Sequence, residues 1–146
     1  MIDLLKSEIE SYNRYDNNQL FYIDQDGKDY SVKSQISFSE WLLIYKCFST
    51  IKVEGLEDNY LIKSQFSKTK NINSIHLFVK QQEGFSFDWH KDNTNVYLHV
   101  IKGVKKVFIE NEMFLVNSGD CIYIKKGKKH KVDSVDNTWA LSVGCD

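Results

Sequence analysis

Two of the four histidines stand in a pattern that can hold a metal ion. One residue separates His90 from Asp92, and on a β-strand this spacing puts both side chains on the same face. His130 is expected on an adjacent strand, from which it would supply a third ligand. Two imidazoles and one carboxylate on one side of an ion leave the opposite positions open, an arrangement typical of non-haem Fe(II) oxygenases.

A framework of glycines surrounds these three residues. The first block contains Gly84, His90, Asp92, Val96 and Gly103, and the second contains Gly119, Lys125, Gly127, His130 and Ser134. Both blocks resemble the two cupin motifs, G-x5-H-x-H-x3-E-x6-G and G-x5-P-x-G-x2-H-x3-N. Asp92 replaces the second histidine of the first motif, and Val96 replaces its glutamate. The usual metal site of three histidines and a glutamate is thereby reduced to two histidines and one carboxylate.

Within the cupins, residues 75–146 resemble the JmjC-type enzymes, most closely the ribosomal-oxygenase or cupin-like branch. The segments that carry the resemblance are HKDNTNVYLHVIKGVK (90–105), SGDCIYIKKGKKH (118–130) and LSVG (141–144). It implies Fe(II) held by His90, Asp92 and His130, with 2-oxoglutarate as cosubstrate. It also implies that Lys105 binds the distal carboxylate of 2-oxoglutarate. The implied activity is that of a 2-oxoglutarate-dependent dioxygenase, a hydroxylase of a protein or peptide side chain or of a small amino-acid-like substrate.

Two other functions fit the same residues. One is a metal-dependent cupin enzyme that does not use 2-oxoglutarate, such as a small-molecule dioxygenase or isomerase. The other is a non-catalytic cupin that binds a ligand. The remaining histidines, His76 and His99, are interpreted as packed residues rather than ligands. Strand alternation puts His99 and Val100 on opposite faces and does not say which of them points inward.

The elements that must position these residues are mostly short strands. From about residue 60 the apolar and polar pattern predicts strands at 75–80, 96–101, 106–109, 113–116, 121–124 and 138–143. Such a series predicts an antiparallel sandwich or barrel, here a single double-stranded β-helix of the cupin or jelly-roll kind over residues 56–146. Residues 1–55 are expected to pack on the barrel as a helical portion, with helices at 4–12 and 41–48 around a strand at 20–23. The whole chain, 1–146, is predicted to be one domain.

Composition narrows the classes of protein and of binding partner that remain. The chain has 146 residues, is 42% hydrophobic and carries a net charge of -1, so it can build one core and has no general attraction to nucleic acid or to a membrane. The lysine-rich KKGKKHK (125–131) is interpreted as a solvated turn. The N-terminus shows no secretory signal, and the three cysteines are far apart, so we expect a cytoplasmic protein. A homodimer is left open.

Overall fold

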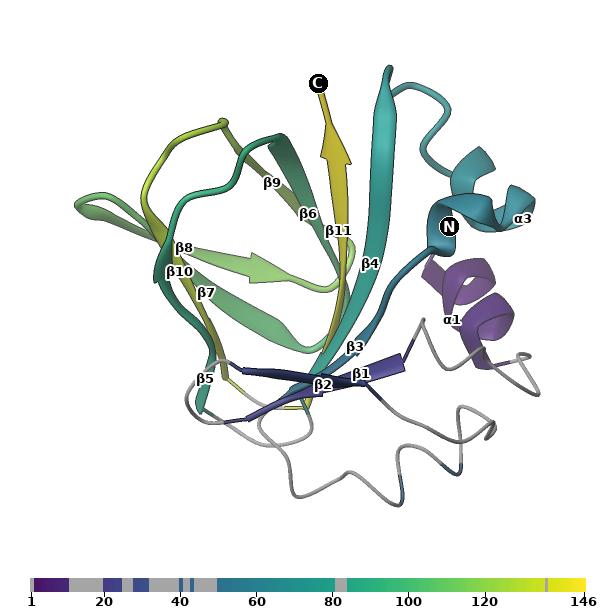
Figure 1. Cartoon of the computed structure of the whole chain (residues 1–146), viewed down its shortest axis with the longest axis horizontal. Coiled ribbons are helices and arrows are strands. Elements are labelled where there is room, and N and C mark those ends of the chain that lie inside the picture. Colours follow the sequence, from purple (N-terminus) through teal and green to yellow (C-terminus); the bar gives the residue numbers. More distant parts are fainter. Residues whose placement is uncertain are drawn as a thin grey trace.

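A computed structural model describes residues 2–10, 20–24, 28–31, 40, 43, 50–80, 84–135 and 137–146, and these residues are mostly β-strand (Figure 1). In chain order the elements are α1 (Ile2–Glu10), β1 (Leu20–Ile23), β2 (Asp29–Ser31), β3 (Thr50–Val53), η1 (Leu56–Asp58), α3 (Tyr60–Ser64), β4 (Ile72–Lys80), β5 (Gly84–His90), β6 (Asn95–Lys102), β7 (Val104–Ile109), β8 (Glu112–Asn117), β9 (Cys121–Ile124), β10 (His130–Ser134) and β11 (Thr138–Cys145). No helix among the described residues is long and apolar enough to cross a membrane.

The strands form two antiparallel sheets that face each other. One sheet has the order β2-β1-β3-β4-β11-β6-β9, and the other has the order β5-β10-β7-β8. Figure 1 shows the second sheet opposite β6, β9 and β11, with α1 and α3 on the far side of β4. The arrangement confirms the predicted mostly-β barrel with a helix at its N-terminal end.

Side-chain alternation along the central strands divides the protein interior into two cores. On β4 the odd positions Ile75, Leu77 and Val79 are fully buried in the core that α1, η1 and α3 cover. The even positions of the same strand point to the other side, into the space between the sheets. The second core fills part of that space and consists of Val96, Leu98, Val100, Val107, Val116, Ile124, Val132 and Ala140. The period of two in the sequence therefore decides which residues can line a site inside the barrel.

The described N-terminal strands extend the larger sheet. β1 pairs with both β2 and β3, and β3 pairs with β4 through Ile51, Lys52 and Val53. The strand predicted at 20–23 is present as β1, and α1 covers most of the helix predicted at 4–12. β2, β3 and α3 were not predicted. The predicted helix at 41–48 falls outside the described residues except for Leu43.

Candidate metal centre and pocket

The space between the two sheets contains a cavity of about 330 Å³. Its lining comes from both sheets and from the loop after β5: Asp29, Lys52, Ser74, His76, Phe78, His90, Asp92, Thr94, Val96, Leu98, Lys105, Ile124, His130, Val132, Ala140, Ser142 and Gly144. All four residues that the sequence singled out for chemistry, His90, Asp92, His130 and Lys105, line this one cavity.

Strand pairing brings the two predicted histidine ligands together. His90 is the last residue of β5, His130 is the first residue of β10, and the two are directly paired across the antiparallel ladder. Their ring centroids lie 4.2 Å apart. Asp92 differs from the prediction because it does not share a strand with His90. It lies two residues beyond the end of β5, where the chain turns toward β6.

The turn nevertheless aims the Asp92 carboxylate at both imidazoles. Its Oδ2 lies 3.1 Å from Nε2 of His130, and its Oδ1 lies 3.6 Å from Nε2 of His90. One ligand atom from each of the three residues lies within 4.8 Å of the others. The backbone holds this turn in place, since the Gly127 amide donates to the Asp92 carbonyl oxygen at 3.1 Å. The loop that precedes His130 is thus tied to the loop that carries Asp92.

Backbone carbonyls fix the orientation of both imidazoles. Nδ1 of His90 lies 2.7 Å from the carbonyl oxygen of Asp88, and Nδ1 of His130 lies 2.8 Å from that of Lys128. A carbonyl only accepts, so in each neutral ring Nδ1 carries the proton and Nε2 keeps its lone pair. In that neutral form both Nε2 atoms could ligate an ion beside Asp92, whereas the hydrogen bond from Nε2 of His130 to the Asp92 carboxylate requires the protonated ring. A carbonyl at Nδ1 is the supporting arrangement that metal-binding histidines commonly have.

Electrostatics keep this cluster charged. The hydrogen bond from His130 holds the pKa of Asp92 below its usual value, against the opposing effect of burial. Burial lowers the pKa of His130, but its hydrogen bonds to Asp92 and to the Lys128 carbonyl outweigh this and raise the pKa above its usual value. Asp92 is therefore an anionic oxygen donor beside two nitrogen donors. That donor set suits a divalent transition metal.

Lys105 lies deeper in the same cavity. Its side chain is 1% exposed, and its Nζ donates to the Ser134 hydroxyl at 2.9 Å. Ser134 is in turn hydrogen-bonded to the hydroxyl of Thr138 at 2.9 Å. Burial, with a smaller contribution from the nearby Lys80, lowers the pKa of Lys105 to about 7, although Asp133 opposes the change. A cation in so dry a place is matched best by an anionic ligand group.

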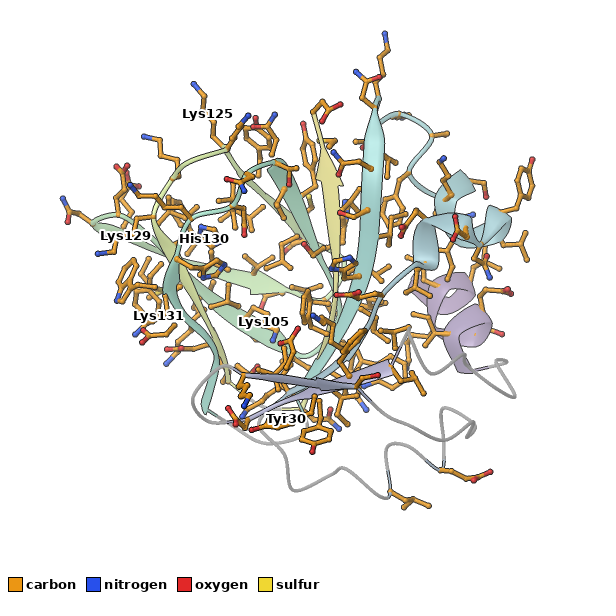
Figure 2. All side chains as sticks on the ribbon, in the orientation of Figure 1. Tyr30, Lys105, Lys125, Lys129, His130 and Lys131 are labelled. Carbon is orange, nitrogen blue, oxygen red and sulfur yellow. The ribbon has the colours of Figure 1, made fainter. Side chains whose placement is uncertain are left out.

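Lys105 and the lysine-rich segment 125–131 lie on opposite sides of the barrel wall (Figure 2). His130 and Lys105 point into the barrel, whereas Lys125, Lys129 and Lys131 lie on its outer side. Lys125 and Lys129 are exposed, as expected of a solvated turn. Lys131 lies over the outward-facing rings of Trp89 and Phe108, with its Nζ 5.7 and 4.9 Å from their centroids. These lysines therefore do not line the cavity.

The structure also decides which way the other singled-out residues point. Val100 belongs to the core inside the barrel, and Val96, which has no atom that can ligate, lines the same cavity as His90, Asp92 and His130. His99 faces the opposite way, with its ring centroid 4.7 Å from that of Phe66, in the helix-covered layer. His76, interpreted from the sequence as a packed residue, lines the cavity instead. Alternation put His76 on the face opposite Ile75 and Leu77, but only the burial of those two residues shows which face lines the cavity.

The N-terminal extension of the sheet contributes a charged group that the sequence did not indicate. Lys52 of β3 forms an ion pair with Asp29 of β2, and its Nζ lies 2.9 Å from a carboxylate oxygen of Glu54. Burial lowers the pKa of Lys52, but the hydrogen bonds with Asp29 and Glu54 outweigh it and raise the pKa above its usual value. The Lys52 ammonium group is thus paired with two carboxylates, and Lys52 itself lines the cavity.

Comparison with known proteins supports the architecture. Residues 74–143 match the model of the AraC-like ligand binding domain. An RmlC-like cupin from Shewanella frigidimarina shares the fold at a TM-score of 0.50, with 10% identity over 66% of this chain and 76% of that chain. The chain has a cupin fold. No curated protein matches the sequence.

Two enzymes share the cupin fold with this chain. The Escherichia coli ribosomal oxygenase YcfD superposes at a TM-score of 0.66, with 15% identity over 99% of this chain, which spans 43% of YcfD. Oxalate decarboxylase from Bacillus subtilis superposes at a TM-score of 0.52, with 17% identity over 67% of this chain and 26% of that chain. At these identities the likeness establishes the fold alone. The function of this chain must be argued from its own residues.

Proposed function

We propose that this cupin is an Fe(II)- and 2-oxoglutarate-dependent oxygenase that hydroxylates a protein or peptide side chain or a small amino-acid-like substrate. The observation that carries the proposal is the joint placement of two features in one cavity. The Nε2 atoms of His90 and His130 converge on the Asp92 carboxylate, and the buried Lys105 lies deeper in the same space. The likeness of the whole chain to part of a ribosomal oxygenase adds support.

The three converging residues suit Fe(II). Two nitrogen donors and one carboxylate oxygen form the ligand set of non-haem iron oxygenases, and Val96 adds no fourth ligand. His90, Asp92 and His130 would hold the ion, and iron with 2-oxoglutarate and dioxygen would supply the oxidising power to hydroxylate a C–H bond. The carbonyls of Asp88 and Lys128 keep both imidazoles in the tautomer that can ligate.

The rest of the cavity suits the cosubstrate. Lys105 would bind the distal carboxylate of 2-oxoglutarate, and the Ser134 hydroxyl holds its Nζ in position. Leu98, Val132 and Ala140 line the cavity with apolar surface, which excludes water from the reacting groups. The apolar wall also strengthens the attraction between Lys105 and an anion, because the local dielectric is low.

The direct test is anaerobic titration of the purified protein with Fe(II) and then 2-oxoglutarate. The expected result is a weak visible charge-transfer band that appears only when both are present, followed by succinate formation when air and a substrate-containing peptide mixture are added. Iron binding without a band, and without succinate for any substrate offered, would contradict the proposal.

Variants separate this function from a cupin enzyme that does not use 2-oxoglutarate. Both functions predict that His90→Ala abolishes turnover. Only the oxygenase predicts that Lys105→Ala raises the KM for 2-oxoglutarate strongly, while Lys106→Ala, the neighbouring lysine on β7, leaves it unchanged. Turnover that survives Lys105→Ala favours the second class. A purified protein whose melting temperature does not respond to Fe(II), Mn(II) or Zn(II) favours a non-catalytic ligand-binding role.

A further inference from the structure

The cavity wall contributed by β4 and β11 presents a second polar pair. His76 and Ser142 are directly opposed in the β4–β11 ladder, and both side chains line the cavity. Among the residues that the structure describes, neither side chain forms a hydrogen bond with a protein group. The His76 ring packs edge-on against Phe78, with 6.2 Å between centroids, and this contact leaves both ring nitrogens unmatched.

An unmatched imidazole and hydroxyl at a cavity wall are poor packing residues. Both side chains are partly exposed inside the cavity, so their hydrogen-bonding groups are open to solvent or to a ligand that enters it. The neighbouring wall positions on these two strands, Phe78 and Ala140, are apolar, so this surface can be built without hydrogen-bonding groups. Ligand groups that enter the cavity are the natural partners for His76 and Ser142.

The charge balance of this wall indicates which ligand groups fit. Lys52, which also lines the cavity, is already paired with Asp29 and Glu54. Burial lowers the pKa of His76, against the opposing effect of Glu54, so the imidazole is neutral at neutral pH. A neutral imidazole offers one donor and one acceptor, and the serine hydroxyl offers both as well. An amide has the complementary set, a carbonyl that accepts and an N–H that donates.

We propose that His76 and Ser142 form a hydrogen-bonding subsite for an amide group of the substrate, a peptide bond or a carboxamide. This inference rests on the proposed function for the reaction and deepens it by naming the substrate class. The subsite lies on the β4–β11 wall, whereas Lys105 belongs to β7 of the facing sheet. Substrate and cosubstrate would therefore be held by different walls of one cavity.

The test is an NMR titration of the imidazole signals with N-acetylglycine N-methylamide as the amide probe. Saturable shifts of the His76 ring signals are expected, with no shift from acetate or from 1,2-propanediol at the same concentrations. His76→Phe keeps the ring contact with Phe78, and Ser142→Ala is the smaller change. Each is expected to weaken binding of the probe about tenfold, the effect of one lost hydrogen bond. His99→Phe, on the outer layer, is the matched control and keeps full affinity.

Three results would overturn the subsite. The first is the absence of a saturable His76 shift with the amide probe, and the second is equal binding of the diol. The third is displacement of the probe by 2-oxoglutarate, which would assign these residues to the cosubstrate. Ser142→Ala decides the matter if His76→Phe does not fold. The titration needs neither iron nor turnover, so probe binding without succinate formation would refute the oxygenase and leave the subsite standing.

Discussion

Replacing Lys105 with methionine is expected to stabilise the protein while removing its proposed cosubstrate anchor. The ordinary lysine pKa of 10.5 falls to about 7 in the folded protein, chiefly through burial of a side chain that is 1% exposed. Each pKa unit corresponds to about 1.4 kcal/mol, so burying the ammonium group costs about 4 to 5 kcal/mol. Methionine has a similar length and no charge. The variant loses the hydrogen bond to Ser134, which costs about 1 kcal/mol, so the expected net gain in stability is about 3 to 4 kcal/mol at pH 7.

The lowered pKa of Lys105 determines how the stability difference between the two proteins changes with pH. Between about pH 7 and 10.5 the unfolded chain keeps a proton on Lys105 that the folded protein has lost. The stability of the wild-type protein therefore rises with pH across this window, and below pH 7 the cost of the buried charge is constant. The Lys105→Met variant lacks this dependence. The stability difference between the two proteins should thus be largest at pH 7 and below, and should shrink steadily toward pH 10.5.

Urea unfolding of both proteins at several pH values between 6 and about 10 measures that difference. Taking the difference cancels the titrating groups that do not interact with Lys105, and the two that do, Lys80 and Asp133, contribute less to its pKa than burial does. The conclusion that burial of the Lys105 ammonium group destabilises the fold would be refuted by a stability difference that does not change with pH. A variant less stable than the wild type at pH 7 would refute it as well.

Three further predictions concern the cosubstrate, the metal and the barrel. At pH 8 binding of 2-oxoglutarate should take up close to one proton, because an anion beside Lys105 raises its pKa, and calorimetry in buffers of different ionisation enthalpy measures this uptake; Lys105→Met should abolish it. Asp92→Ala should weaken metal binding in a competition assay by more than about 100-fold, since a lost supporting hydrogen bond alone costs up to that much. The control Asp88→Ala should leave metal affinity unchanged. Asp92→His should bind metal without forming succinate. Gly103→Ala should lower the free energy of unfolding by about 2 to 4 kcal/mol, because its φ of 78° disfavours a side chain and its Cβ would lie 2.3 Å from the Asn137 carbonyl oxygen. Gly127→Ala, with φ 81° and open space around its Cβ, is the control and should cost only about 1 kcal/mol.

The strands of the barrel could be predicted because their evidence is local. Alternation of apolar and polar residues marked most of β4, β6 and β11, and the spacing of glycines around His90 and His130 indicated the cupin arrangement before any contact was known. The N-terminal strands were harder. β2 and β3 are short, with three and four residues, and they are strands because β1 and β4 pair with them. That pairing is a contact between distant segments, which a local pattern does not record.

The sequence by itself determined the chemical identity of the candidate ligands. Two histidines and one aspartate in a glycine framework, with no acid at Val96, specify which atoms are available to an ion. Only the tertiary structure decided where those atoms lie. The pairing of β5 with β10 sets His90 against His130, and a turn outside the strand brings in Asp92. Strand alternation fixes relative faces but not which face is inside, so packing of the helical layer against Ile75 and Leu77 was needed to turn His76 toward the cavity and His99 away from it.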